Sequence, residues 1–530
     1  MNPRLVLPRL RRLAGEHKLF TGALAVGAFV RLLAMVAYPG ALWFAGDSYV
    51  YLGAALRPQP NLSKSTGYSF FLRLLLPFHS LTLVTAVQHL MGLAVAVLIY
   101  VLLRRSNVSK TWAAIATMPV LFDGYIIEDE HLIMAETVFT FLLMVAVCLL
   151  LWRPGLPRWW VAVIAGLLVG YAVIVRTEGV VMLAVLPLFL LLRGWAWKTV
   201  RGWLVAIVFA VASLVPLGAY VNWFHERTGH YGTTMSAGFY LWGRVSSFAD
   251  CARINPTGEQ AVVCPTQPIA DRTPPGNYVW HAPYVHQDLN SIGGPVSYAG
   301  NKVLTDFAIH AVEAQPLDYA KTVFFDTMLS FGFPRIAYPG AGTTYYYNFH
   351  LHYVTAKYNL LPPDNPDHEW IPGGTAYQDW LAYGHQAPGV VHKIIAAPVL
   401  VYQRVVFTYG PLLAVIFLVG LGGVLSMTAA RRRGADPGSW RRPAQALRSV
   451  RLSSVRVRWA PRGTTVLPWV TAVALLVTPI ALADFDYRYL IPAIPFACLA
   501  AGLAFAPRRA APVVPASPAS METTVPDQVA

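Results

Sequence analysis

The stretch LTLVTAVQHLMGLAVAVLIYVLL, residues 81–103, decides the class of fold, because its 23 residues include no Asp, Glu, Lys or Arg. A helix that crosses a bilayer needs about 20 predominantly apolar residues, so this stretch predicts a membrane span. Nine other segments of similar composition extend the prediction to an all-α, polytopic membrane protein with about ten transmembrane helices. The predicted spans are residues 19–38, 81–103, 111–127, 132–152, 159–175, 179–192, 203–223, 405–427, 464–483 and 490–506.

The composition of the whole chain agrees with this class. Of its 530 residues, 56% are hydrophobic and 13% are charged, whereas soluble globular proteins carry about 25% charged residues. A soluble cytosolic domain is therefore excluded. The formal net charge of +15 would also suit a protein that binds nucleic acid, but the retention of positive residues on the cytoplasmic side of a membrane explains it better.

The distribution of charge orients the chain in the membrane. If the amino terminus is cytoplasmic, the inner segments hold 25 basic residues and the much longer outer segments hold 15, while most acidic residues lie outside. We therefore expect both termini to be cytoplasmic. The basic opening RLRRLAGEHK and the apolar run after it resemble a signal peptide, but further spans follow directly, so we interpret them as a retained signal anchor.

The spans divide the chain into modules. We expect an N-terminal transmembrane module of about seven helices at 1–223, an outer region at 224–404, and a C-terminal module of about three helices at 405–509. The outer region is too aromatic for simple disorder and predicts an ordered cap, with amphipathic pieces such as Tyr319–Phe333 against the membrane surface. The basic cytoplasmic loop 428–463 contacts lipid or only sets the topology, and the tail 510–530 is predicted to be disordered.

The four cysteines fall into two classes. Cys148 and Cys498 lie in predicted spans, where a cysteine behaves as a small apolar residue. Cys251 and Cys264 lie in the outer region and are a candidate disulfide in an oxidising compartment. A metal site is less well supported, because no CxxC or HxxxH spacing accompanies this pair.

Polar residues gather at the outer ends of the spans, which is the main functional clue. Asp47, in ALWFAGDSYVYLGAAL, lies just beyond the first span. One interpretation is a helix cap, in which Asp47 accepts backbone N–H groups of a helix that runs through Tyr51 and Leu52. The other interpretation is a catalytic carboxylate, and one residue can serve both purposes.

A second acidic group lies in the short loop IIEDEHLIMAET, residues 126–137. Its members, Glu128, Asp129, Glu130, His131 and Glu136, are crowded, so some of the carboxylates must be protonated, paired or metal-bound. A solvated interfacial cluster would account for Glu128 and Glu130. Glu136, which we place about one turn into the fourth span, is expected to face the protein interior or a water-filled cavity.

Two further outer turns combine acids with arginine. IVRTEGV supplies Arg176 and Glu178, and ADFDYRYLIPAIPF supplies Asp484, Asp486, Arg488 and Tyr489. These groups either form mutual ion pairs that close the bundle, or the two arginines neutralise a phosphate, for which the planar guanidinium is well suited. Together the outer ends offer carboxylates that accept a proton or hold a cation, and arginines that hold a lipid phosphate.

At these residues the chain resembles the integral-membrane glycosyltransferases of the C-type fold (GT-C), particularly the group of protein O-mannosyltransferases and lipid A aminoarabinose transferases. The resemblance rests on Asp47 in GDSYVYL, on Gly67 and Tyr68 in GYSFFLRLL, and on Glu136 at the opening of the fourth span. It also rests on the RTEG turn and on the RYLIPAIP run before the last span. It covers about the first 220 residues and the final hundred.

The resemblance implies a donor and a mechanism. The donor is a polyprenyl-phosphate sugar, hexosyl or pentosyl, and Asp47 is the general base for an inverting transfer to the hydroxyl of a glycan, glycolipid or protein acceptor. Glu136 is the second catalytic candidate, while Arg176, Arg488 and Tyr489 are expected to bind the donor phosphate. Glu128, Asp129 and Glu178 form the supporting acidic cluster. Separately from the resemblance, the preference for Arg over Lys and the Ala-rich usage indicate a high-GC bacterium, so we expect the outer side of the plasma membrane, and with it the active site, to be extracytoplasmic.

The chain departs from the family pattern at two places. Members often carry His-Pro or Pro-Pro before the Gly-Tyr pair, whereas this chain has SKSTGY, so the sugar stays open. Many relatives carry two adjacent acids in the first outer loop, whereas Ser48 follows Asp47 here. A divalent cation (Mg²⁺, Mn²⁺ or Ca²⁺) would have to draw on Asp47 together with Asp129 or Glu128, which leaves metal dependence open.

Two other classes of function compete with a glycosyltransferase. A transporter or lipid flippase is also polytopic, but such proteins place ionisable residues near the membrane midplane, in two repeated halves. Here no internal repeat is found, and only Arg31 lies well inside a span, where it snorkels or pairs inward. A non-catalytic scaffold that binds another protein through its outer region leaves Asp47, Glu136 and Arg488 without a role.

Overall fold

The computed structural model describes residues 15–281, 290, 294–352, 371–384, 390–433 and 464–507. In these residues the chain is all-helical, and β-structure is limited to the isolated bridges Leu42–Leu132 and Ile371–Gly374. The helices before the lateral region are α2 (Lys18–Ala37), α3 (Ala45–Leu56), α4 (Gly67–Leu75), α5 (Leu81–Arg105), α6 (Lys110–Ile115), α7 (Met118–Phe122), α8 (Gly124–Asp129), α9 (Glu136–Leu151), α10 (Trp159–Val175), α11 (Met182–Leu192) and α12 (Val200–Thr228). The lateral region contains α13 (Ala237–Ser246), α14 (Cys251–Ile254), α15 (Glu259–Val262), α16 (Pro275–His281), α18 (Tyr298–Ala314) and α19 (Pro316–Leu329). The helices after it are α20 (Ala341–Tyr345), α22 (Ala376–Gly384), α23 (Lys393–Val405), α24 (Gly410–Arg433), α25 (Val466–Leu482) and α26 (Leu490–Ala504).

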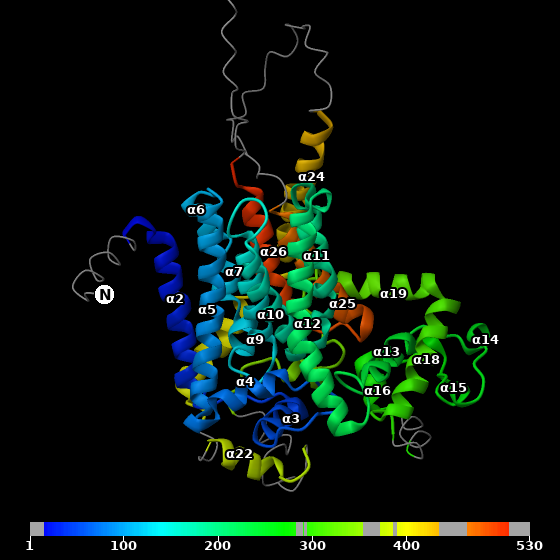
Figure 1. Ribbon diagram of the computed structural model, residues 1–530. Helices are drawn as coiled ribbons and strands as arrows, with labels where there is room; N and C mark the ends of the chain where they lie inside the picture. The colour runs from blue at the N-terminus through cyan, green and yellow to red at the C-terminus, as the bar shows by residue number, and fades with distance from the viewer. Residues whose placement is uncertain are drawn as a thin grey trace, which may run out of the picture.

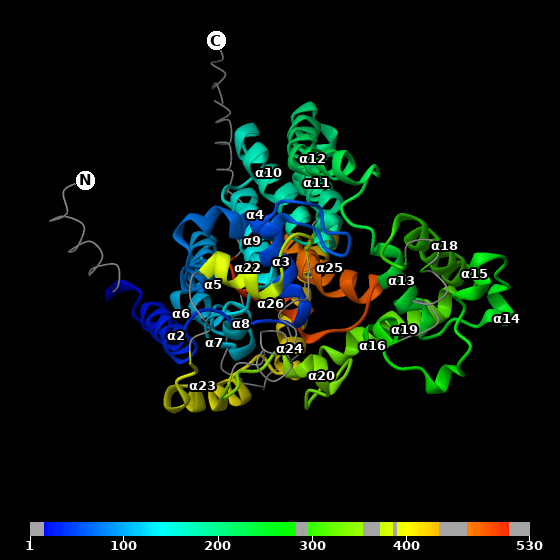
Figure 2. The same ribbon diagram turned by 90° about the horizontal axis from the view of Figure 1, so that it is seen from below.

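The apolar helices run side by side in one bundle (Figure 1). Five helical segments of the described chain are long and apolar enough to cross a membrane, or six if the bent pair α23–α24 forms one span. Four shorter apolar helical segments, among them α9, α10 and α25, accompany them. The chain is therefore a multi-pass membrane protein, whereas the count of about ten spans stays a prediction. Helices α3 and α22 cover one end of the bundle, the lower end in Figure 1, and Figure 2 looks onto that end. The loops predicted to be outer meet there.

The predicted third span, residues 111–127, is not one helix. It is broken into α6, α7 and α8, with Pro119 in the first turn of α7 and Asp123 between α7 and α8. The Asp123 carboxylate caps α8 by accepting from Tyr125 N at 2.9 Å, and it also accepts from Thr408 N at 2.7 Å. A buried carboxylate needs such donors. The chain therefore leaves the helix at the end of α7, where the Asp123 side chain can reach these two backbone N–H groups.

The predicted span at 405–427 begins differently as well. Its apolar helix starts at Gly410, after a break that bends α23 and α24 by 54°. The break is where Asp123 binds Thr408 N and where Gly124 N donates to Val406 O at 2.8 Å. The two irregular segments thus satisfy each other's backbone groups, as irregular backbone buried at membrane depth requires.

Glu128 in α8 and Glu130 just after it do not form a solvated interfacial cluster, because both are at most 2% exposed. Glu130 receives two hydrogen bonds from Arg31, at 2.7 and 2.8 Å, and lies 2.8 Å from His89 Nδ1. Arg31 therefore pairs inward and does not snorkel. A buried ion pair is tolerated when its remaining groups are bonded, and Arg31 also donates to Leu121 O at 2.8 Å.

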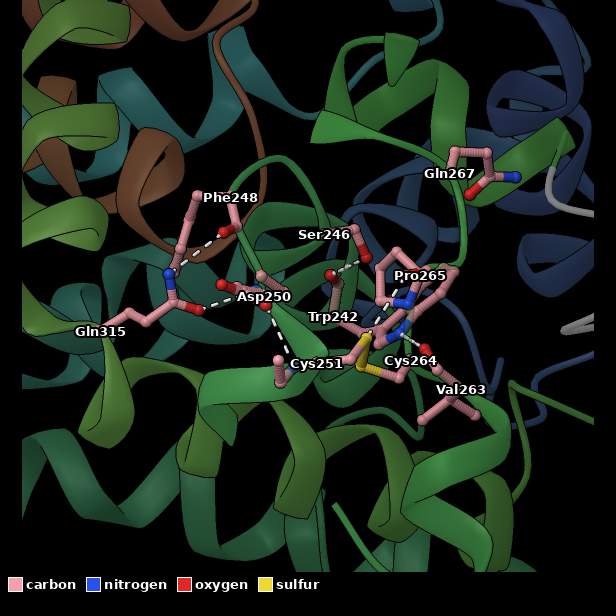
Figure 3. The surroundings of a disulfide bond; sticks show 12 residues. Trp242, Ser246, Phe248, Asp250, Cys251, Val263, Cys264, Pro265, Gln267 and Gln315 are labelled. Carbon is pink, nitrogen blue, oxygen red and sulfur yellow. Dashed lines mark hydrogen bonds between the residues drawn. A yellow bond between two sulfur atoms is a disulfide. The ribbon is translucent and has the colours of Figure 1, made fainter. Parts of the chain in front are cut away.

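In the described residues, part of the predicted outer region is helical and forms a lateral domain beside the bundle. This lateral domain comprises the described residues of 237–329, from α13 to α19 (Figures 1 and 2). It has its own apolar core around Trp242, Leu304 and Phe307. Cys251 and Cys264, the candidate pair, form a disulfide that joins the start of α14 to the chain just after α15 (Figure 3). Cys148 and Cys498 are buried free thiols.

Parts of the predicted organisation fall outside the described residues. The basic loop 428–463 is described only to residue 433, and the tail 510–530 not at all. Of the outer region, residues 282–289, 291–293, 353–370 and 385–389 are likewise outside the description.

The packing of Glu130 against α5 gives a first prediction. Gly92 faces this carboxylate so closely that a Cβ at Gly92 would overlap it. We expect Gly92→Ala to lower the free energy of unfolding by about 1–3 kcal/mol, the usual cost of overpacking a core, visible as a lower melting temperature in detergent. The control is Gly218→Ala in α12, where a Cβ meets nothing within 4 Å. Equal melting temperatures for the two variants would contradict this packing.

Candidate functional site

A cavity of about 980 Å³ opens at the end of the bundle that α3 covers. Its walls come from segments far apart in the chain, because α3, the following loop, the lateral domain, the loop before α20 and the turn before α26 all contribute. The polar side chains that line it are Asp47, Asn61, Ser63, Lys64, Tyr240, Thr273, Asn277, Thr343, Tyr346, Asp484, Asp486, Arg488 and Tyr489. Two of the predicted site segments, around Asp47 and around Arg488, therefore meet in one space.

Asp47 lies in the first turn of α3, and its carboxylate faces two cations. Its Oδ2 is 2.9 Å from Lys64 Nζ and 3.3 Å from Arg488 Nη1. The capping interpretation is wrong, since α3 begins after Phe44 without a side-chain cap from Asp47. Burial raises the pKa of Asp47, but the charges of Lys64 and Arg488 outweigh it and bring the pKa below its usual value. The group is a carboxylate at neutral pH.

The backbone around Asp47 is fixed by Ser48, whose side chain turns away from the cavity. Phe44 N donates to Ser48 Oγ at 2.8 Å, and Ser48 Oγ donates to Ile133 O at 3.1 Å. These bonds tie the start of α3 to the loop after α8. Ser48 therefore supports the orientation of Asp47, which explains structurally why a hydroxyl follows the acid in this chain.

Lys64 was not among the sequence-predicted site residues. Its loop is an Asx turn, in which Asn61 Oδ1 accepts from Ser63 N at 2.8 Å and from Lys64 N at 2.9 Å. This turn projects the ammonium group toward Asp47, which raises the pKa of Lys64 although burial lowers it. In the sequence, SKSTGY stands out only as a departure from the family pattern directly before Gly67 and Tyr68, and nothing in that pattern assigns a role to Lys64.

Arg488 lies on the single helical turn Tyr487–Tyr489 before α26, and Asp486 fixes this turn. Arg488 N donates to Asp486 Oδ1 at 3.1 Å, while Asp486 Oδ2 accepts from Tyr347 OH at 2.6 Å. The guanidinium lies 5.2 Å from the ring centre of Phe44 and 5.3 Å from that of Tyr489. Two aromatic faces and two carboxylates thus position the cation at the cavity wall.

Arg176 lies behind this wall and does not line the cavity. It forms ion pairs with Glu136 and, at 3.0 Å, with Glu178. Its guanidinium is 5.7 Å from the ring centre of Tyr489, so the Tyr489 ring contacts both arginines.

Glu136 is the first residue of α9 and is fully buried. It does not lie one turn inside a span, because the loop before it extends further than the apolar pattern suggested.

Glu128 and Asp129 are buried but also lie off the cavity. Burial, reinforced by nearby carboxylates, raises the pKa of both groups well above the usual range. Asp129 accepts from Thr137 Oγ1 at 3.0 Å. The described residues include no group of three or more His, Cys, Asp or Glu side chains arranged to hold a metal ion.

Asp484 joins the bundle to two outer segments that wall the cavity. Its Oδ2 accepts from Gly276 N at 2.6 Å, and its Oδ1 accepts from Tyr338 OH at 2.9 Å and from Phe485 N at 2.7 Å. Burial raises the pKa of Asp484 to about 7 despite these donors. The residue lines the cavity and positions the segments on either side of it.

The match to known proteins falls on the transmembrane part of the chain. Residues 74–230 match the family described as dolichyl-phosphate-mannose-protein mannosyltransferase. This match confirms the resemblance to the protein O-mannosyltransferase group. The matched residues include Glu136, Arg176 and Glu178, whereas Asp47, Lys64 and Arg488 lie outside them. No curated protein is significantly similar in sequence to this chain.

Two similar solved structures are both oligosaccharyltransferases of Archaeoglobus fulgidus. The AglB enzyme in complex with an inhibitory peptide and a dolichol-phosphate is 13% identical, with a TM-score of 0.40, over 91% of this chain and 50% of that one. The apo oligosaccharyltransferase is 12% identical, with a TM-score of 0.39, over 90% and 50%. This chain thus spans about half the length of either structure.

The site gives a prediction for stability against pH. Because the pKa of Asp484 is raised in the folded protein to about 7, the native state binds a proton between about pH 4 and 7 that the unfolded chain does not. This contribution to stability is present at low pH and is lost as the pH rises through 7. We therefore expect the melting temperature of wild type, measured relative to that of Asp484→Asn, to be higher at pH 5 than at pH 8. A difference that is the same at both pH values would contradict the assignment.

Proposed function

We propose that this protein is a membrane glycosyltransferase that transfers a sugar from a polyprenyl-phosphate donor to a hydroxyl group of an acceptor. The observation that carries the proposal is the convergence of Asp47, Lys64 and Arg488 in one cavity, at the end of the bundle that α3 covers. A carboxylate can take the acceptor proton, and two adjacent cations can hold the donor phosphate. The family match over residues 74–230 supports the same class of reaction.

In the proposed step, Asp47 is the general base. Its carboxylate takes the proton of the acceptor hydroxyl while the acceptor oxygen bonds to the anomeric carbon of the sugar. The bond between that carbon and the phosphate oxygen breaks, and the electron pair leaves with polyprenyl phosphate. Attack opposite to the leaving phosphate inverts the configuration at the anomeric carbon.

The negative charge that develops on the leaving phosphate requires cations at the cavity wall. We assign this role to Arg488 and Lys64, because both line the cavity and both contact Asp47. Arg176 is a positioning residue in this mechanism. Glu136 and Glu178 neutralise it, and it acts on the site through the ring of Tyr489.

Donor binding and activation of the base are coupled in this arrangement. Both cations lie against Asp47 Oδ2, which makes the carboxylate a weak base. A donor phosphate offers the same two cations a second anion, so binding draws them away from Asp47 and raises its basicity. Lys64 provides positive charge directly beside Asp47. We therefore propose that Lys64, not a metal shared with Asp129, serves the reaction.

The route of the acceptor and the side of the membrane on which the reaction takes place are proposed from the lining of the cavity and from the sequence-based prediction. Tyr240 and Asn277 of the lateral domain and Tyr346 line the cavity, so the lateral domain shapes the part that faces away from the bundle. We propose that the acceptor enters from there and that this end of the bundle is extracytoplasmic, at the plasma membrane of a bacterium.

The test is release of polyprenyl phosphate by purified protein in nanodiscs. A panel of hexosyl and pentosyl polyprenyl phosphates is offered with a crude cell-envelope acceptor. We expect release with at least one donor, and Asp47→Asn to lower the rate by about 10²–10⁴-fold, the usual contribution of a general base. The control is Asp306→Asn, which alters an exposed carboxylate on α18 and leaves the rate unchanged.

Two results would overturn the proposal. Well-folded wild-type protein that releases no polyprenyl phosphate from any donor would favour transport or a scaffold. Release that is as fast in Asp47→Asn as in wild type would place the base elsewhere.

A second prediction concerns Lys64→Met and the pH profile. Because Lys64 lowers the pKa of Asp47, its removal raises that pKa, and the acid limb of kcat/KM moves to higher pH. The loss of a charged contact to phosphate should also raise the KM for the donor by roughly tenfold or more. Lys302→Met, which removes an exposed lysine of α18, serves as control. An acid limb at the wild-type pH would show that Asp47 is not the group that titrates.

A further inference from the structure

Helix α19 has two faces of different chemistry, and its polar face forms hydrogen bonds with α13 and α25. Asp326 Oδ2 accepts from Arg244 Nη1 of α13 at 2.6 Å, and Tyr319 OH donates to Ala481 O at the end of α25 at 3.0 Å. Just before the helix, Gln315 Oε1 accepts from Asp250 N at 2.8 Å (Figure 3). This polar face binds α19 to the rest of the lateral domain and to helix α25 of the bundle.

The opposite face of α19 is an exposed apolar stripe. Leu317, Phe324, Phe325 and Met328 follow a spacing of 7, 8 and 11 residues, which places them on one side of a helix, and Leu317 and Phe325 are 74% and 64% exposed. Lys321 is the charged residue on this side. Its Nζ lies 3.9 Å from Asp318 Oδ1, so the side chain reaches toward the edge of the polar face, as a snorkelling lysine does.

The position of α19 relates this stripe to the membrane. The helix lies across the direction of the bundle helices, with α13, α15, α16 and α18 on its lower side in Figure 1. The stripe points away from the lateral domain, because the contacts to that domain come from the other face. Tyr319 meets the last turn of the apolar helix α25, so α19 lies at the level where a membrane-embedded helix of the bundle ends.

We propose that α19 is a membrane-interface helix whose apolar stripe lies in the lipid surface beside the bundle. Lipid is the occupant that fits, because α19 packs on the apolar helix α25, and Leu482, the last residue of that helix, is also apolar and exposed. A helix with one apolar and one charged face lies in the plane of the interface, with its apolar face about 5–10 Å deep. The lateral domain is thereby held at a fixed height over the membrane.

The test places an environment-sensitive NBD fluorophore on α19 of the full chain in nanodiscs. The two native free cysteines are buried and the other two form the disulfide, so a single added cysteine is labelled selectively. The probe positions are Phe324→Cys and Met328→Cys. The matched control is Ile309→Cys on α18, an apolar side chain with similar exposure in the same domain.

The expected result is quenching of the probes at 324 and 328 by doxyl-labelled lipid, with iodide quenching constants several-fold lower than at 309. Probes at 324 and 328 that iodide quenches as strongly as at 309 would overturn the proposal. Protection from iodide without quenching by doxyl lipid would also overturn it, since a second copy or another protein would then cover the stripe. Use of two positions keeps the test valid if one variant fails to fold.

Discussion

The ion pair between Asp47 and Arg488 joins residues 441 positions apart. A charge that is partly removed from water is costly unless a partner of opposite sign meets it, so this pair favours the close approach of the segment around Asp47 and the segment around Arg488. Lys64 adds a third member from the loop before α4. The N-terminal and C-terminal helices therefore close around the cavity at the place where these charges meet.

The same constraint extends inward from the cavity. Arg488 and Arg176 share the ring of Tyr489, and Arg176 is balanced by Glu136 at the start of α9. Arg488 is held in place by groups of the protein itself, namely Asp47, Asp486 and the ring of Tyr489. Preorganised charge of this kind is what a reaction with a phosphate leaving group needs, and it explains why a residue off the cavity can still matter to the reaction.

The sequence predicted the helical membrane class because an apolar run of about 20 residues matches the thickness of the bilayer core. It also predicted that Asp47 and Arg488 lie at the same end of the molecule, since sidedness follows from charge. It did not predict that Asp123 breaks the third apolar segment, nor that Glu130 pairs with Arg31 over 99 positions, because such contacts depend on helix packing. Lys64 cannot be found in this way, because a loop lysine has no periodic pattern. For Arg176 the sequence leaves both ion pairing and phosphate binding open, and the structure pairs it with Glu136 and Glu178.

The most direct test of this mechanism is the affinity of the protein for polyprenyl phosphate, measured in nanodiscs for wild type and Asp47→Asn. If the lipid phosphate and the Asp47 carboxylate compete for Lys64 and Arg488, removal of the carboxylate charge frees both cations. We therefore expect Asp47→Asn to bind polyprenyl phosphate more tightly than wild type does, although it no longer supports transfer. Equal or weaker binding by the variant would contradict the claim that these two cations hold the phosphate.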